Sequence, residues 1–263
     1  MSFLTSIAAP VAAAVAVYFF AGWLVSLARR DASVVDVLWG PGFLLAAAVA
    51  ARLGAGHPAR RALVLALAGL WSLRLALHIF RRNRGLGEDY RYRAMRERHG
   101  ARFAGVSLFT VFLLQAALSL WISAPLVAAT ATGADRPLGV LDFAGAALWG
   151  FGFFFEAVGD WQLARFKADP AHRGQVMDRG LWRYTRHPNY FGDAALWWGF
   201  YLLACAVPRG AWTILSPIVM TFLLLRVSGV ALLEKGLAAS KPRYRDYIAR
   251  TSAFVPWFPR ERG

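Results

Sequence analysis

The sequence of 263 residues contains one cysteine, Cys205, and only half as many acidic as basic residues. A single cysteine excludes an intrachain disulfide framework and a cysteine-based metal site, and inside an apolar run it is interpreted as a small buried hydrophobe. The sequence also lacks a Gly-x-Gly-x-x-Gly turn after a strand and a Walker motif, so a nucleotide would need another kind of site. No linker, internal repeat or low-complexity block divides it, which favours one membrane domain over residues 1–263.

The remaining composition indicates a membrane protein. Hydrophobic residues make up 58% of the chain, the mean hydropathy is +0.43, and there are 11 Trp and 19 Phe, which is too apolar for a soluble domain. The formal net charge of +15 would suit a nucleic-acid-binding protein. Here, however, the basic residues lie in short loops between apolar runs, which is typical of membrane topology, so no nucleic-acid partner is expected.

Seven apolar stretches are long enough to cross a bilayer as helices. The chain is therefore predicted to be all-α, a polytopic integral membrane protein with seven transmembrane helices. No basic residues precede the first stretch, so we expect it not to be a cleaved signal peptide. Lys and Arg in short loops stay in the cytoplasm, and their distribution places the N-terminus outside and the C-terminus in the cytoplasm. The stretches are residues 6–28, 34–53, 61–80, 103–127, 137–160, 188–208 and 211–234.

Charged and polar side chains inside the predicted spans cost free energy unless they are paired or hydrated, so their positions are informative. Most lie near the end with the basic loops, and three sets are spaced i, i+4, on one helix face. This pattern predicts a polar pocket open to the cytoplasm, although interfacial residues and snorkelling arginines are an alternative explanation for each residue alone. Only Asp142 lies clearly at the other end. The residues near the cytoplasmic end are Asp36, Arg74 with His78, Glu156 with Asp160, Asn189 with Asp193, Arg226 and Glu234.

Two basic loops add candidates for binding. Residues 81–92 interleave basic, acidic and aromatic side chains, and a cytoplasmic loop that neutralises its own charge is an alternative interpretation. Residues 162–187 lead into the sixth predicted span, where Pro188 suits the first turn of a helix. Free N–H groups at that helix start, beside Arg186 and His187, would suit an anionic phosphate.

The sequence from Arg186 to Asp193 reads Arg-His-Pro-Asn-Tyr-Phe-Gly-Asp, with residues 162–170 before it and Tyr244-Arg245-Asp246-Tyr247 after it. These segments resemble the C-terminal half of the steroid 5-alpha-reductase and sterol reductase superfamily. Residues 87–92, 233–235 and 250–257 resemble its bacterial branch, the 3-oxo-5-alpha-steroid 4-dehydrogenases. The Arg-His-Pro-x-Tyr core is also shared with membrane methyltransferases of the isoprenylcysteine carboxyl type.

The resemblance implies an NADPH-dependent enzyme of the bacterial inner membrane that transfers a hydride to a conjugated lipid enone, such as the 4,5 double bond of a 3-oxo steroid. The lipid would enter from the bilayer and contact residues 1–127, and NADPH would reach residues 137–263 from the cytoplasm. No metal is implied. Matching positions assign cofactor binding to Asp160, Arg165, Lys167, Trp182, Tyr184, Arg186, His187, Asn189, Tyr190, Asp193, Tyr244 and Tyr247.

The positions that activate the substrate carbonyl in the animal enzymes hold different residues in this sequence. They carry a Gln-Glu pair on the second span and a Tyr near the end of the third, where this chain has Val35-Asp36 and His78-Ile79. An enone needs a hydrogen-bond donor on its ketone oxygen, because negative charge develops there during hydride attack. The candidates are Asp36 and His78, with Glu88, Asp89 and Tyr90 of the neighbouring loop as competitors.

Two other functions stay open from the sequence. One is an S-adenosylmethionine-dependent methyltransferase acting on a lipid or prenyl-cysteine, and the other is a sterol-binding membrane protein without catalysis. Arg165 and Lys167 favour a phosphate-bearing cofactor over S-adenosylmethionine, which has no phosphate.

Overall fold

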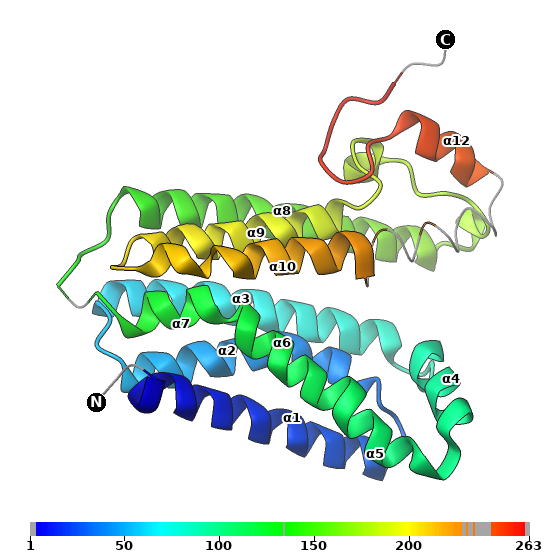
Figure 1. Ribbon diagram of the computed structural model, residues 1–263. Coiled ribbons are helices and arrows are strands. Elements are labelled where there is room, and N and C mark those ends of the chain that lie inside the picture. Colours follow the sequence, from blue (N-terminus) through cyan, green and yellow to red (C-terminus); the bar gives the residue numbers. More distant parts are fainter. Residues whose placement is uncertain (1–3, 134, 228–229, 231–233, 235–242, 261–263) are drawn as a thin grey trace. The chain divides into compact units, whose positions relative to one another are not determined.

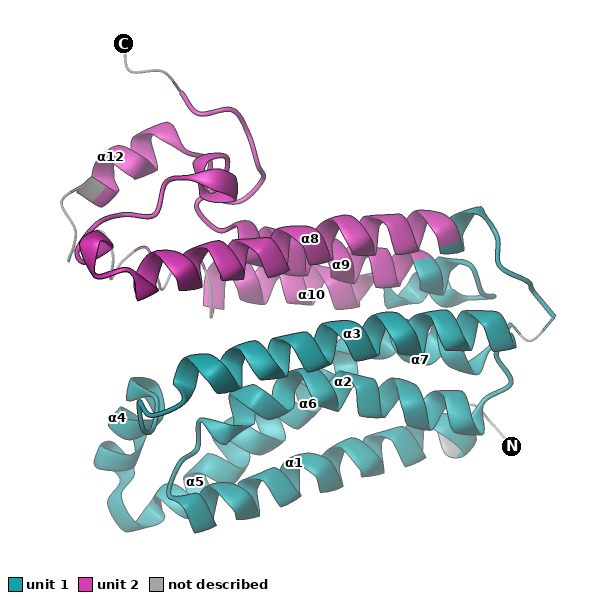
Figure 2. Cartoon of the chain, turned by 180° about the vertical axis from the view of Figure 1, so that it is seen from behind, with its two compact units in different colours: residues 1–142, 203–213 teal, residues 143–202, 214–263 magenta. Residues whose placement is uncertain are grey.

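The computed structural model describes residues 4–133, 135–227, 230, 234 and 243–260. All regular secondary structure in these residues is helical, so the prediction of an all-α chain is confirmed. The chain forms two compact units (Figure 2). Unit 1 contains residues 1–142 and 203–213, and unit 2 contains residues 143–202 and 214–263.

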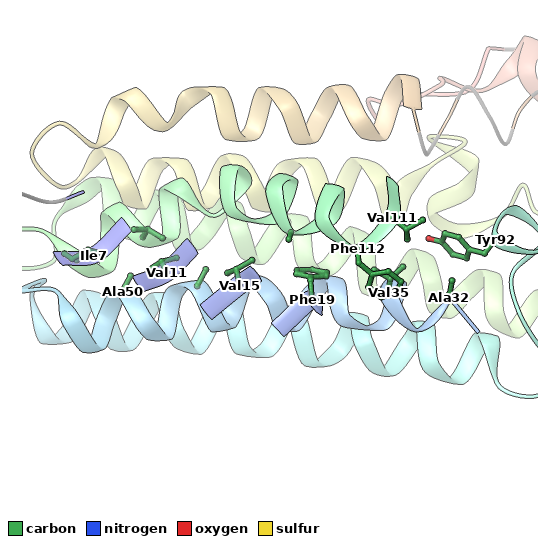
Figure 3. Close-up of a cluster of buried hydrophobic side chains, with 14 of the residues drawn as sticks. Ile7, Val11, Val15, Phe19, Ala32, Val35, Ala50, Tyr92, Val111 and Phe112 are labelled. Carbon is green, nitrogen blue, oxygen red and sulfur yellow. The ribbon is translucent and has the colours of Figure 1, made fainter. Parts of the chain in front are cut away.

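Unit 1 is built from helices that carry an apolar stripe. In α1 the buried positions Val11, Val15 and Phe19 follow Ile7 at a spacing of four residues, which places them on one helix face. This face packs against α2 and against the helical segment from Phe103 to Ile122, and together they form a hydrophobic core (Figure 3). The elements of unit 1 are α1 (Ala9–Arg29), α2 (Val34–Leu53), α3 (Pro58–Asn83), α4 (Tyr90–His99), α5 (Phe103–Ser107), α6 (Leu114–Ile122) and α7 (Ala124–Ala131), with π-helical turns at Leu4–Ala8 and Leu108–Leu113 (Figure 1).

A buried ion pair closes one end of unit 1. The Arg60 guanidinium donates to both oxygens of Asp142, at 2.7 and 2.8 Å, and both side chains are almost completely buried. Arg60 also donates to the backbone carbonyls of Arg136 and Pro137, and Asp142 accepts the N–H of Gly139. The isolated acid of the sequence therefore has a structural partner 82 residues away. Breaking such a pair leaves an uncompensated buried charge.

Unit 2 contains three long helical segments and a C-terminal helix followed by an irregular segment. The third segment starts at Leu215, so Pro217 lies in the first turn of its helix, where a proline is tolerated. The elements are α8 (Val140–Ala168), α9 (Pro188–Cys205), α10 (Leu215–Phe222) and α12 (Arg243–Arg250), with short 3-10 turns at Pro170–His172 and Gly180–Arg183 and a π-helical turn at Leu223–Val227 (Figure 1). Residues 140–142 of α8, residues 203–205 of α9 and residues 210–213 of the 3-10 turn Gly210–Ile214 belong to unit 1.

Glycines let α8 and α9 touch through their backbones. Gly145, Gly152 and Gly159 repeat every seven residues in α8, and Gly192 and Gly199 do so in α9. A Cβ atom added to Gly152 would lie 2.5 Å from the carbonyl oxygen of Gly192, and one added to Gly199 would lie 2.7 Å from that of Gly145. Small residues of this kind allow close packing between membrane helices. The contact fixes which residues of the two helices face each other.

Six helical segments in the described part of the chain are long and apolar enough to cross a membrane, which supports a multi-pass membrane protein. The expected span 188–208 is helical, as α9, but it is not among the six, because its polar first turns lower its hydropathy. Residues 228–229 and 231–233 of the last expected span, and Lys235 of the matched motif, lie outside the described residues. The seven-span count and the orientation therefore stay predictions. The six are Ser6–Arg29, Val34–Leu53, Pro58–Asn83, Tyr90–Ile122, Val140–Ala168 and Gly210–Val227.

Candidate functional site

The first polar cluster lies in unit 1, at the start of α2. Asp36 accepts a hydrogen bond of 2.7 Å from the Tyr92 hydroxyl on one oxygen, and its other oxygen lies 2.9 Å from the Arg91 guanidinium. The Asp36 side chain is 14% exposed and Tyr92 is 7% exposed. Tyr92 lies at one end of the apolar core, near Val35 and Val111 (Figure 3). The cluster therefore places a tyrosine hydroxyl and a carboxylate together at the edge of an apolar core.

The loop before α4 positions this cluster through its own backbone. Asp89 caps α4 by accepting the N–H of Arg91 at 2.9 Å, and its own N–H donates to the Ser33 hydroxyl at 2.7 Å. Gly85 and Gly87 have positive φ angles of 81° and 71°, which glycine adopts without a Cβ penalty. The cap begins the helix at Tyr90, so that Arg91 and Tyr92 fall in its first turn and reach α2.

Glu88 ties the same loop to the segment before α2. One of its oxygens accepts the Ala32 N–H at 2.8 Å, and both oxygens accept from the Arg96 guanidinium, at 2.7 and 2.9 Å. Burial alone would raise the pKa of Glu88, but the hydrogen bonds from Arg96 and Ala32 outweigh it and lower the pKa below its usual value of 4.5. The carboxylate is therefore held ionised as a structural anchor for the loop.

The catalytic candidates from the sequence are distributed unevenly around this cluster. Asp36 belongs to it, and Glu88 supports it from the adjoining loop. Tyr90 is 68% exposed and points away from the core, whereas Tyr92, two residues later, is buried. His78 lies half-buried on α3. The sequence reasoning missed Tyr92 as a site residue, although the Asp89 cap and the helical phase after it would have separated the two tyrosines.

The second cluster lies in unit 2, at the start of α9. Arg186 pairs with Glu234 at 2.7 Å, and the His187 Nε2 atom lies 3.1 Å from the same carboxylate oxygen. Arg186 and His187 are buried, at 9% and 3% side-chain exposure. The His187 ring stacks on Tyr190, with 5.6 Å between ring centroids and 10° between ring planes. The Arg186 guanidinium also donates to the backbone carbonyls of Ile248 and Thr251, so all three of its nitrogen atoms have protein partners.

The segment after α12 is hydrogen-bonded to the turn that precedes α9. The Thr185 hydroxyl donates to the Phe254 carbonyl at 2.8 Å, the Arg186 N–H donates to the Ser252 carbonyl at 2.9 Å, and the Trp257 N–H donates to the Tyr184 carbonyl at 2.9 Å. These bonds hold the Arg-His-Pro turn between α9 and the C-terminal segment. Arg186 and His187 are therefore fixed in place by backbone contacts that are distant in sequence.

The two tyrosines of α12 are interior residues of unit 2. Tyr244 and Tyr247 are 4% and 2% exposed, and their ring centroids lie 5.7 Å apart. The Tyr247 hydroxyl donates to the Trp182 carbonyl. Burial raises the pKa of Tyr244 to about 12 and raises that of Tyr247 as well, so both are neutral at physiological pH. Tyr247 therefore joins α12 to the turn at Gly180–Arg183, and Tyr244 packs beside Tyr247.

Polar residues of α8 and α9 contact each other next to Gly159, at one end of the glycine contact. The Asn189 side-chain amide donates to the Asp160 carboxylate at 3.0 Å, and the Trp182 indole N–H donates to the Gly159 carbonyl at 3.0 Å. Asp193 lies one turn after Asn189 on α9 and is half-buried. The cofactor candidates Asp160, Trp182 and Asn189 therefore lie close together, and their role in cofactor binding stays a prediction.

The remaining cofactor candidates face outward. Arg165 and Lys167 are exposed near the end of α8, and the Arg165 guanidinium lies 5.2 Å from the centre of the Trp161 ring. Tyr184 is 38% exposed and contacts Phe258 edge to face. These side chains are accessible to a ligand from solvent, whereas Arg186 and His187 are not.

Residues 22–251 match the model of a family described as "Protein of unknown function (DUF1295)", a family associated with steroid 5-alpha-reductase-like proteins. The chain is 28% identical over 269 aligned positions to the uncharacterized protein C594.04c of Schizosaccharomyces pombe, covering 89% of this chain and 75% of the yeast protein. No solved structure matches the chain. Because the family model covers most of its length, the chain belongs to the DUF1295 family.

Proposed function

We propose that this protein is an NADPH-dependent membrane reductase that acts on the 4,5 double bond of a 3-oxo steroid or a similar flat lipid enone. The observation that carries the proposal is the buried Tyr92 hydroxyl, which lies 2.7 Å from the Asp36 carboxylate in unit 1. The animal steroid reductases carry a carboxylate on the second span and a tyrosine near the end of the third as partners of the substrate carbonyl. Asp36 and Tyr92 would supply the same two groups here, with the tyrosine on α4 instead. Membership of the family supports the same class of enzyme.

Tyr92 would act as the hydrogen-bond donor to the ketone oxygen. Its hydroxyl has one hydrogen, which it donates to Asp36 in this structure, so it must turn from Asp36 to the ketone when the lipid binds. Asp36 keeps its ion pair with Arg91 after that turn, which limits the cost of losing the hydroxyl. At the apolar edge of the core, a donor aimed at a developing negative charge is worth more than in water.

The residues of unit 2 fit the chemistry of NADPH. When bound, the dinucleotide would supply the hydride for the β carbon of the enone, while a proton from water completes the reduction at the α carbon. Exposed Arg165 and Lys167 would neutralise phosphate oxygens, and Asp160 with Asn189 would hold hydroxyl or amide groups. The Arg186 guanidinium is occupied by Glu234 and two carbonyls, so its role is to position His187 and the C-terminal segment.

The location follows from the same proposal. Lipid-exposed apolar side chains on several helices suit entry of the substrate from the bilayer, and the basic loops suit entry of the cofactor from the cytoplasm. The membrane would be the bacterial plasma membrane, with seven spans, the N-terminus outside and the C-terminus in the cytoplasm. In this topology α9 is the remaining span, since its polar first turns face α8 and are shielded from lipid.

A methyltransferase that uses S-adenosylmethionine is the second candidate, because it shares the Arg-His-Pro-x-Tyr core. Ligand titration of the protein purified in detergent separates the candidates. NADPH at a hundred times its Kd should stabilise the fold by about 2.7 kcal/mol, and S-adenosylmethionine should have no effect. Stabilisation by S-adenosylmethionine alone would refute the reductase. Stabilisation by a sterol alone would support a binding protein without catalysis.

The assignment of Asn189 gives a residue-level test of the cofactor site. Asn189→Ala removes the amide that donates to Asp160, and should abolish the shift in melting temperature that NADPH causes. Gln175→Ala is the matched control, because the Gln175 side chain is exposed and its amide donates to the Ala171 carbonyl in its own loop. An unchanged NADPH shift in Asn189→Ala would mean that the positions carried over to unit 2 are wrong.

A further inference from the structure

A basic hollow in unit 2 adjoins the second cluster, because Thr251, whose carbonyl accepts from Arg186, also lines the hollow. It has a volume of about 730 Å³ and is formed by the turn at Gly180–Arg183, the end of α12 and the C-terminal segment. A smaller hollow of about 400 Å³ adjoins it and shares Asp178, Arg179 and Arg250. The two hollows therefore adjoin at these three residues.

The charge of the larger hollow is strongly positive. Arg179, Arg183, Arg250 and Arg260 line it, and among the described residues Asp178 is the one acidic residue that does so. Arg250 lies 3.5 Å from Asp178. No acidic side chain in the described part of the chain lies within 4.0 Å of a guanidinium nitrogen of the other three arginines. Three guanidinium groups that have no ion-pair partner among the described residues therefore surround one space, which suits an anion, and planar guanidinium groups match phosphate oxygens in pairs.

The walls of the hollow are fixed by backbone hydrogen bonds. The Arg260 N–H donates to the Arg250 carbonyl at 2.9 Å, and the Trp257 N–H donates to the Tyr184 carbonyl at 2.9 Å. On the other wall, the Leu181 N–H donates to the Gln162 side chain at 3.0 Å. The arginines are thus carried by a preformed frame, so that little backbone order is lost when a ligand binds.

The same contacts place the hollow at the level of the membrane–water interface. The turn that lines it is bonded to Gly159 and Gln162 of α8. α8 has 29 residues and is about 43 Å long, so its last turns extend beyond a hydrocarbon core of about 30 Å. Trp161 is 56% exposed at this level and carries Arg165 over its ring, which is typical of an interfacial belt.

The C-terminal segment exposes aromatic side chains beside the arginines. Trp257 is 71% exposed and Phe258 is 76% exposed, and neither belongs to a helix. Phe258 also lines the hollow. Large apolar side chains exposed outside the spans, next to uncompensated arginines, suit the boundary between headgroups and acyl chains, where aromatic rings and cations are both favoured.

We propose that this hollow binds the phosphate of an anionic phospholipid headgroup, with Trp257 and Phe258 lying in the adjacent interfacial layer. A nucleotide could offer the same phosphate chemistry, but two observations favour a lipid: the interfacial level of the hollow and the exposed aromatic residues beside it. Of the residues assigned to NADPH, Tyr247 lines the smaller hollow, whereas Asp160 and Asn189, on α8 and α9, line neither hollow. Phospholipid binding here does not depend on the proposed reductase activity.

The test uses the full-length protein, delipidated in an uncharged detergent. Binding of dioctanoyl phosphatidylglycerol and dioctanoyl phosphatidylcholine is measured by native mass spectrometry. Each arginine near an anionic lipid contributes a factor of about five, so the double variant Arg179→Gln, Arg183→Gln should bind phosphatidylglycerol about 25-fold more weakly. The control variant Arg173→Gln, Arg245→Gln removes the same charge from exposed positions outside both hollows, and should bind it as wild type does.

Three results would overturn the proposal. Equal affinity of the wild type for the two lipids would show that headgroup charge is not recognised. Equal losses in the hollow and control variants would show attraction by net charge alone. Displacement of phosphatidylglycerol by NADPH, together with loss of NADPH binding in the hollow variant, would assign the hollow to the nucleotide. Absence of NADPH binding in every variant, with phosphatidylglycerol binding as expected, would refute the reductase and support the lipid site.

Discussion

Replacing Tyr92 with phenylalanine tests the proposed carbonyl donor at the level of one oxygen atom. The ring of Tyr92 is 7% exposed and belongs to the apolar core of unit 1, so phenylalanine keeps the packing and removes only the hydroxyl. The hydroxyl makes one hydrogen bond, of 2.7 Å, to Asp36. A hydrogen bond to a charged group contributes about 1.5–3 kcal/mol to stability, and here Arg91 continues to satisfy the carboxylate. The expected loss of stability is therefore near the lower end, about 1.5 kcal/mol.

The expected effect on turnover is much larger. A positioned proton donor contributes about 10²–10⁴-fold to a rate, so single-turnover reduction of a 3-oxo-4-ene steroid by the NADPH-loaded protein should slow by about that factor. NADPH affinity should stay as in the wild type, because the cofactor residues lie in unit 2. Tyr90→Phe is the control, since Tyr90 is in the same turn of α4 but is 68% exposed. The reasoning is refuted if Tyr92→Phe reduces the steroid within two-fold of the wild-type rate.

Three further predictions concern stability, each measured by thermal unfolding in detergent. Asp142→Leu should cost about 3–5 kcal/mol, because it leaves Arg60 buried without its acid, and adding Arg60→Met should recover part of the loss; no recovery would contradict the ion-pair argument. Gly192→Leu should prevent folding because its side chain would enter the α8 backbone, whereas Gly150→Leu, at a site with open space, should be tolerated. The pKa of Glu88 is lower in the folded protein than its usual value of 4.5, so its contribution to stability is complete above about pH 4.5 and is lost as the pH falls through the lowered pKa. Glu88→Gln should therefore reduce the loss of stability in acid. If Glu88→Gln and the wild type lose stability equally in acid, Glu88 does not anchor the loop.

The resemblance pointed to Asp160 and Asn189 in the sequence, but it did not say that they contact each other. In the structure the Asn189 amide donates to Asp160, where the glycines of α8 and α9 bring the two helix backbones into contact. The i, i+4 spacing of Glu156 with Asp160 and of Asn189 with Asp193 is local, so it could be read from the sequence, whereas the pairing of the two helices could not.

The partners of several site residues could not be predicted in this way. Tyr92 reaches Asp36 across 56 residues, because the Asp89 cap begins α4 at a particular residue and so selects Tyr92 over Tyr90. Tyr247 is joined to Trp182 across 65 residues, which makes it an interior residue. The basic hollow likewise depends on the path of the C-terminal segment back to the turn before α9.

The sequence by itself determined that this is an all-α membrane protein with polar groups gathered near the ends of its helices. Apolar length, the positions of the basic loops and the i, i+4 pairs are properties of neighbouring residues, so they need no tertiary structure. Only the tertiary structure decided which tyrosine meets the carboxylate of α2, that the acid of α8 is neutralised by Arg60, and that four arginines surround one space. These are contacts between segments that are distant in the sequence, so they depend on how the helices pack and on the hydrogen bonds that hold the loops in place.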